Sequence, residues 1–225
     1  MVEFPDMPYI DLLIEKLWKG REYGQAAVMV GTGFSRNAES TNPSTQPFPT
    51  WADLGKVMYR SLYPNNDPSD RQYVENEISA ISGDGVLKLA YEYEKSFGRT
   101  GLDTLLRNSI PDSQYRPGRL HKLLMQLPWA DVFTTNYDTL LERTRIVDKN
   151  YCLVTTHEDI PGSTKPRIVK LHGSFPSNRP FIFTEEDYRT YPIKHAPFVN
   201  MVQQSLMENT FCLIGFSAND PIFIN

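Results

Sequence analysis

Four apolar, strand-like runs in this chain each end in a short cluster of small polar residues. These clusters are Gly31-Thr32-Gly33-Phe34-Ser35, Thr134-Thr135-Asn136-Tyr137-Asp138, His172-Gly173-Ser174-Phe175 and Gly215-Phe216-Ser217. In open α/β folds the ligand binds at the carboxyl edge of the parallel sheet, where such strand ends meet. Packing alone is a poor explanation for four of them, so the pattern predicts a nucleotide pocket that contains a histidine.

The order of the expected elements indicates the fold class. Strands are expected over 25–30, 131–134, 151–155, 167–171 and 210–214, with a further short strand over 181–183. Helices are expected over 9–21, 139–145 and 198–208, and Thr184 is expected to cap the segment that follows it. This alternation predicts an α/β protein with a Rossmann-like, doubly wound parallel sheet.

A long segment with helical patterns separates the first two expected strands. The stretch 37–49 is polar and rich in Ser, Thr, Asn and Pro, which predicts a loop that can act as a lid. Thr50 is expected to cap a helix, and further helices are expected over 86–97, 102–108 and 117–127. We therefore expect one domain over 1–225 with a helical module inserted at about 50–127. The chain stops soon after its last strand, so we expect a longer polypeptide or a partner that covers that edge.

Composition narrows the classes of function. The chain has 23 basic and 27 acidic residues and a net charge of -4, which gives no electrostatic case for binding nucleic acid. Its two cysteines, Cys152 and Cys212, lie in apolar runs and form no Cys-x-x-Cys pair, so we expect no zinc ribbon and no other metal site. No run reaches membrane-spanning length and no signal peptide is present, so a cytoplasmic protein without membrane contact is expected.

The glycines after the first strand form part of a dinucleotide-binding pattern. Gly31 and Gly33 would let the backbone approach a pyrophosphate. The third glycine position of that pattern is Arg36, and no strand ending in Asp or Glu follows about 20 residues later, where a Rossmann dehydrogenase binds its ribose. A tight turn without a ligand explains this motif equally well.

The other clusters carry candidate polar side chains. Asn136 could orient a water or a ribose hydroxyl, and Asp138 could accept hydrogen bonds from a carboxamide, although either could simply cap the helix expected next. His172 could take a proton from a hydroxyl near neutral pH, although a lone histidine is more often structural. Ser217 could bind a phosphate or ribose and Asp220 an adenosine ribose, or both could form a turn.

Taken in order, the four clusters resemble the motifs of the sirtuin (silent information regulator) NAD-binding domain. The Gly31 to Ser35 cluster is similar to the family's Gly-Ala-Gly-x-Ser turn, and Asn136-Tyr137-Asp138 matches its Asn-x-Asp motif. His172-Gly173 matches the His-Gly motif of the catalytic base, and Gly215-Phe216-Ser217 resembles the Gly-Thr-Ser turn. The resemblance extends from about residue 26 to 221.

Two departures refine this resemblance. Sirtuin deacylases carry a four-cysteine zinc module after the His-Gly motif, whereas residues 181–188 of this chain contain no cysteine. Their Gly-Ile-Pro-Asp-Phe-Arg loop is also missing, and this chain has Phe48-Pro49-Thr50-Trp51 near that place in the sequence instead. Both features resemble the sirtuin-like NADase branch, whose members are N-terminal effector domains of bacterial antiphage defence proteins.

The resemblance implies that NAD+ is the substrate, that it is cleaved to nicotinamide and ADP-ribose, and that no metal takes part. It implies that Asn136 and His172 are catalytic, and that NAD+ is bound by Gly31, Gly33, Phe34, Ser35, Thr135, Asp138, Gly215, Ser217 and Asp220. It also implies a homo-oligomer that works with a sensor domain or a partner protein of a defence complex. Two alternatives are an NAD-dependent protein deacylase, which the missing cysteines disfavour, and a low-turnover nucleotide-binding assembly module, which the retained Asn136 and His172 disfavour.

Overall fold

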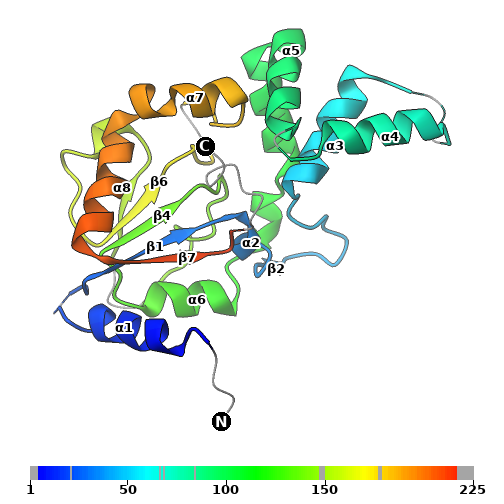
Figure 1. Cartoon of the computed structure of the whole chain (residues 1–225). Helices are drawn as coiled ribbons and strands as arrows, with labels where there is room; N and C mark the ends of the chain where they lie inside the picture. The colour runs from blue at the N-terminus through cyan, green and yellow to red at the C-terminus, as the bar shows by residue number, and fades with distance from the viewer. Residues whose placement is uncertain are drawn as a thin grey trace.

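The computed structural model describes residues 5–20, 22–65, 67, 69–83, 85–146, 150–176 and 179–216. Within these residues a five-stranded sheet runs through the protein (Figure 1). Its strands lie in the order β5 (Cys152–Val154), β6 (Arg167–Lys170), β4 (Asp131–Thr134), β1 (Ala26–Val30) and β7 (Thr210–Ile214). Every neighbouring pair in this sheet is parallel, which confirms the predicted Rossmann-like α/β fold.

Helices cover both faces of the sheet, as a doubly wound arrangement requires. On one face, α1 (Met7–Leu17) and α6 (Arg119–Gln126) pack against a cluster that includes Val28 and Val132. On the other face, α8 (Ala196–Glu208) contributes Phe198 to a cluster that includes Met29 and Val169. All residues of β1 are buried, which explains why its sequence is apolar throughout instead of alternating.

A helical module stands at one end of the sheet, next to the short helix α2 (Thr32–Ser35) that follows β1 (Figure 1). It contains α3 (Trp51–Leu62), α4 (Arg71–Ala80) and α5 (Gly85–Ser109). Thr50 caps α3 in a capping box with Asp53, as predicted. The predicted break in α5 occurs at Gly98, which has a φ of 75°.

Two features of the module differ from expectation. Helix α6 falls inside the expected insertion of about 50–127 but packs against the sheet, so the helices that stand away from the sheet span 51–109. Helix α4 was not predicted, because it is mostly polar and its one buried residue is Glu77. Asp70 caps this helix by accepting a hydrogen bond from the Tyr73 amide. An aspartate at that position is the sequence feature from which the start of the helix could have been predicted.

The predicted loop 37–49 is tied down at both ends. A short strand within it, β2 (Glu39–Ser40), pairs with β3 (Tyr115–Arg116), which follows the 3-10 turn η1 (Asp112–Gln114). Near its other end, the Phe48 ring packs on Tyr115 with 4.7 Å between ring centroids. The loop therefore folds back onto the segment that joins α5 to α6.

Two predictions for the second half of the chain are wrong. The helix expected over 139–145 is a turn, because the Asp138 carbonyl accepts from the Lys170 ammonium and the Thr139 amide binds the Asp112 carboxylate. The strand expected over 181–183 is irregular, although its residues are buried and the Ile182 amide donates to the carbonyl of His172 at 3.0 Å.

Thr184 caps α7 (Glu185–Lys194) through a capping box with Asp187, as predicted. The 3-10 turn η2 (His157–Asp159), which was not predicted, follows β5. The helices that the structure describes include none that combines the length and the apolar character needed to span a membrane.

Candidate functional site

The parallel register brings the predicted motifs to one edge of the sheet. Val30 of β1 lies beside Thr134 of β4 on one side and Ile214 of β7 on the other, and Thr134 in turn lies beside Lys170 of β6. The four strands therefore end at the same level. The turns that follow them carry the glycine motif, Asn136 and Asp138, His172, and Gly215.

The glycines after β1 and β7 pack the two turns against each other. The Gly31 amide donates to the Ile214 carbonyl at 2.8 Å, and the Gly33 amide donates to the Gly215 carbonyl at 2.9 Å. A Cβ atom on Gly33 would lie 2.8 Å from the Gly215 carbonyl oxygen, so only glycine allows this approach. The Gly33 N–H, which we predicted to face a pyrophosphate, thus binds the protein backbone in this structure.

Asn136 is buried and its amide nitrogen is held by two acceptors. Nδ2 donates to the Gly31 carbonyl at 3.0 Å and to Ser35 Oγ at 2.9 Å, and the Asn136 backbone amide binds Thr134 Oγ1 at 3.1 Å. Its Oδ1 atom is buried without a hydrogen-bond partner. A buried acceptor left unpaired costs about 1–3 kcal/mol, so a water or a ligand hydroxyl that donates to Oδ1 would be stabilised there.

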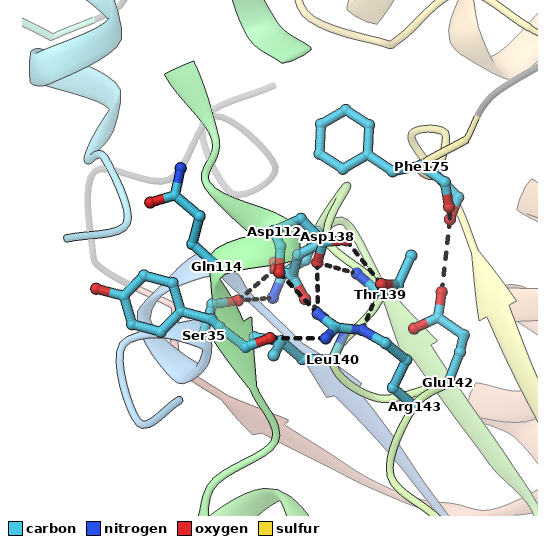
Figure 2. Close-up of polar contacts among 12 residues, drawn as sticks. Ser35, Asp112, Gln114, Asp138, Thr139, Leu140, Glu142, Arg143 and Phe175 are labelled. Carbon is cyan, nitrogen blue, oxygen red and sulfur yellow. Dashed lines mark hydrogen bonds and ion pairs between the residues drawn. The ribbon is translucent and has the colours of Figure 1, made fainter. Parts of the chain in front are cut away.

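Ser35 connects Asn136 to Asp138. The Ser35 hydroxyl donates to Asp138 Oδ2 at 2.6 Å while accepting from Asn136, and Asp138 Oδ1 accepts from the Leu140 amide at 3.2 Å (Figure 2). The bond from the Leu140 amide is the contact that a capping residue makes, so Asp138 caps the turn that follows it and also belongs to the network. The three side chains, which come from two strand ends, form one continuous polar network.

This network forms the polar side of a pocket. The helical module and the segments beside it supply the apolar side, where the Trp51 ring stacks on Phe183 with 4.9 Å between centroids and 10° between planes. The lining comprises Thr32, Ser35, Asn136, Tyr137 and Asp138 together with Phe48, Pro49, Trp51, Leu54, Ile110 and Phe183. A mostly apolar wall with a few convergent polar groups is the usual composition of a small-molecule site.

His172 lies at the end of β6 and is almost fully buried. Its Nδ1 is 3.5 Å from the Tyr188 hydroxyl, and its ring meets Tyr191 edge to face with 5.6 Å between centroids. Burial, reinforced by the positive charges of Arg179 and His195, lowers the pKa of His172 from 6.5 to about 3. The ring is therefore neutral at pH 7, which is the state that can accept a hydrogen bond or a proton.

The two predicted catalytic side chains open into different cavities. His172 lines a second cavity, between the sheet face and helices α7 and α8, whereas Asn136 lines the pocket described above. The described residues of 150–176 reach the Ser35–Asn136–Asp138 network by binding the backbone of the turn after β4. The Phe175 amide donates to the Tyr137 carbonyl at 3.0 Å, so the His172 segment packs directly on the Asn136 turn.

The other predicted binding residues lie in different parts of the structure. Phe34 packs in the core against His121, with 4.8 Å between ring centroids, and Thr135 is buried directly after β4. Gly215 adopts a φ of 78° beside Phe34. Ser217 and Asp220 lie outside the described residues. In the described ranges, no group of three or more His, Cys, Asp or Glu side chains is arranged to hold a metal ion.

Sequence reasoning missed the contacts that hold the turn after β4. Asp112 Oδ1 accepts from the Thr139 amide at 2.8 Å and from Arg143 Nη2 at 2.9 Å, and Arg143 Nη1 donates to the Tyr115 carbonyl at 2.6 Å (Figure 2). On the sheet side, the Lys170 ammonium lies 2.9 Å from Glu142 Oε1. A lysine inside an apolar strand was a usable signal, because buried charges are almost always paired.

Comparison with known proteins agrees with this geometry. Residues 130–225 match the family model of the SIR2-like domain. The chain is 28% identical over 218 residues to an NAD(+) hydrolase ThsA of Acinetobacter baumannii (strain 532279), a match covering 93% of this chain and 40% of that protein. It is 31% identical over 226 residues to an NAD(+) hydrolase ThsA of Bacillus cereus (strain MSX-D12), covering 95% and 41%.

A more distant relative has a related name. The chain is 22% identical over 213 residues to "Defense-associated sirtuin 2" of Bacillus subtilis, covering 92% of this chain and 19% of that protein. The chain thus spans about two fifths of the length of the NAD(+) hydrolases that it matches. Residues 130–225 are therefore similar to a SIR2-like domain, and the parallel sheet with the motifs at its edge gives the chain a Rossmann-like fold.

Proposed function

We propose that this chain cleaves NAD+ between nicotinamide and ribose, releasing nicotinamide and ADP-ribose. The observation that carries the proposal is the buried Ser35–Asn136–Asp138 network, whose Asn136 Oδ1 is an unpaired acceptor at the polar side of an apolar pocket. The printed names of the relatives from Acinetobacter baumannii and Bacillus cereus, NAD(+) hydrolase, support the same reaction.

In the proposed reaction the bond from ribose C1′ to the nicotinamide nitrogen breaks, and a water oxygen bonds to C1′. Nicotinamide leaves as a neutral molecule, so the ribose passes through an oxocarbenium-like state that the protein has to position and stabilise. Asn136 Oδ1 would accept a hydrogen bond from the water or from a ribose hydroxyl. His172 would accept the proton that the water or hydroxyl releases.

Asp138 would contact the carboxamide of the leaving group. Its Oδ2 is fixed by Ser35, which gives the carboxylate one orientation in the pocket. The pyrophosphate and adenosine end would lie along Gly31, Gly33, Phe34, Ser35, Thr135, Gly215, Ser217 and Asp220. A substrate that touches both Asn136 and His172 has to bridge the two cavities that these side chains line.

The proposed biological setting is antiphage defence in the cytoplasm. The printed name of the Bacillus subtilis relative, a defense-associated sirtuin, supports this setting. Within it, the chain would be the effector that removes NAD+, assembled as a homo-oligomer with a sensor domain or partner protein. NAD+ is the substrate in this proposal and no metal takes part.

One assay separates the proposal from its alternatives. The full-length protein is incubated with NAD+, alone and with an acyl-lysine peptide, and nicotinamide and ADP-ribose are measured by chromatography. The proposal expects both products in equal amounts without peptide. Nicotinamide release that requires the peptide would instead indicate a deacylase, and binding of NAD+ without product would indicate an assembly module.

A further inference from the structure

Lys170 is a fully buried lysine at the end of β6, two residues before His172. Its side chain is 1% exposed, and Nζ lies 2.9 Å from Oε1 of Glu142, whose side chain is 12% exposed. The same ammonium donates a hydrogen bond to the backbone carbonyl of Asp138. Desolvating a lysine is costly, so a buried one persists only where its partners compensate the charge.

Both partners of Lys170 belong to the turn after β4, the turn that carries Asn136. Residues 135–138, at the start of this turn, lie in neither a helix nor a strand, so their carbonyls need donors from elsewhere in the chain. The Lys170 ammonium donates to the carbonyl of Asp138. The Phe175 amide donates to the carbonyl of Tyr137, the residue before Asp138, at 3.0 Å. Two consecutive carbonyls of the turn are thus held from the segment 170–175, which has His172 within it.

We propose that Lys170 is a positioning residue that fixes the Asn136 turn relative to His172, with Glu142 as its counter-ion. A hydrogen bond from a charged donor is stronger than one between neutral groups, so Lys170 holds the Asp138 carbonyl more firmly than an amide would. A displacement of about 1 Å at a reacting group can cost about a hundredfold in rate. The expected effect on rate rests on the proposed NAD+ cleavage, whereas the expected effect on the position of the turn does not.

The test removes both charges together, because Lys170→Met alone would leave Glu142 buried and unpaired. The variant Lys170→Met/Glu142→Gln is compared with Arg167→Met/Asp131→Asn. This second pair joins β6 to β4 at the amino ends of the two strands, away from the turn after β4, with 2.7 Å between Arg167 Nε and Asp131 Oδ1. Amide hydrogen exchange of the segment 136–142, the rate of NAD+ cleavage and the melting temperature are measured for both variants and the wild type.

We expect exchange in 136–142 to accelerate at least about tenfold in the Lys170→Met/Glu142→Gln variant and kcat to fall about a hundredfold with a smaller change in KM. The Arg167→Met/Asp131→Asn variant should keep wild-type exchange in that segment and wild-type kcat, whatever its melting temperature. Lys170→Gln/Glu142→Gln is the substitute if the methionine variant does not fold, with the same expectation.

Wild-type protection of 136–142 in a folded Lys170 variant would overturn the positioning role, as would equal loosening in the Arg167→Met/Asp131→Asn variant. If the wild-type protein does not cleave NAD+, the proposed function fails, and hydrogen exchange still decides the role of Lys170.

Discussion

The Ser35 hydroxyl donates a hydrogen bond of 2.6 Å to Oδ2 of Asp138, joining the turn after β1 to the turn after β4. The same hydroxyl accepts from Asn136 Nδ2, so its single proton sets the direction of the network. Asn136 must then present its carbonyl oxygen, and not its amino group, as the unpaired atom. The orientation that the proposed chemistry needs is thus set by Ser35 together with the Gly31 carbonyl, which also accepts from Nδ2.

Ser35→Ala should therefore lower activity without unfolding the protein. Loss of the bond to Asp138 and of the acceptor for Asn136 should cost about 1–3 kcal/mol, or about tenfold to a hundredfold in kcat. Ser205→Ala is the matched control, since Ser205 of α8 is also buried and accepts a hydrogen bond from Asn209, which follows that helix. Nicotinamide release by the two variants is the measurement, and equal rates would contradict the role of Ser35.

The lowered pKa of His172 predicts how stability depends on pH. The folded protein keeps the ring neutral, with a pKa of about 3 against 6.5, so the unfolded chain binds the extra proton. The stability from this group is complete above pH 6.5 and is lost as the pH falls from 6.5 toward 3. Between pH 7 and pH 5 the loss should be about 2 kcal/mol.

Urea unfolding of the wild type and of His172→Gln at pH 7 and pH 5 measures this contribution. The variant should lose about 2 kcal/mol less than the wild type over that interval. His195, whose pKa is lowered to about 4, adds a loss of the same sign to both proteins and leaves the difference intact. An identical pH dependence in the two proteins would show that His172 is not held neutral by the fold.

Gly215→Ala should destabilise the fold through the packed turns. Gly215 has a φ of 78°, and a Cβ atom there would lie 2.6 Å from the Phe34 amide nitrogen. The left-handed backbone alone costs about 1–2 kcal/mol for a residue with a side chain, which corresponds to a fall of about 3–8 °C in melting temperature. Gly162→Ala is the control, because no atom lies within 4 Å of a Cβ at that position. Calorimetry that gives equal melting temperatures for both variants would contradict this account.

The Asp112 carboxylate should contribute more to stability than an exposed ion pair. It binds the Thr139 amide and hydroxyl and the Arg143 guanidinium, so Asp112→Asn should cost about 1–2 kcal/mol in unfolding free energy. Glu39→Gln breaks the exposed pair with Arg116 and should cost at most about 1 kcal/mol. Chemical denaturation of both variants measures the two losses. A larger loss of unfolding free energy in Glu39→Gln than in Asp112→Asn would contradict this role of Asp112.

Local pattern was enough to predict the sheet and its edge. The apolar run of β1 and the capping box of Thr50 with Asp53 depend on residues that are neighbours in sequence, and both are present. The ends of β1, β4, β6 and β7 lie level in the observed register, as the shared position of their polar clusters predicted.

Contacts between distant residues explain what local pattern could not predict. The turn over 139–145 has a helical pattern, but Asp112 and Lys170, each about 30 residues away in sequence, take its backbone groups. The resemblance implies that Phe34 binds NAD+, and the structure adds that its ring packs on His121 of α6. Its neighbours in sequence carry no information about that helix.

Nicotinamide release from NAD+ by Asn136→Ala, against the wild type and Asn200→Ala, tests the central claim most directly. Asn200 is exposed on α8, so its substitution reports the effect of the same change outside the site. The account predicts wild-type release by Asn200→Ala and at least about a hundredfold slower release by Asn136→Ala, at equal melting temperatures. Full activity of folded Asn136→Ala would contradict it.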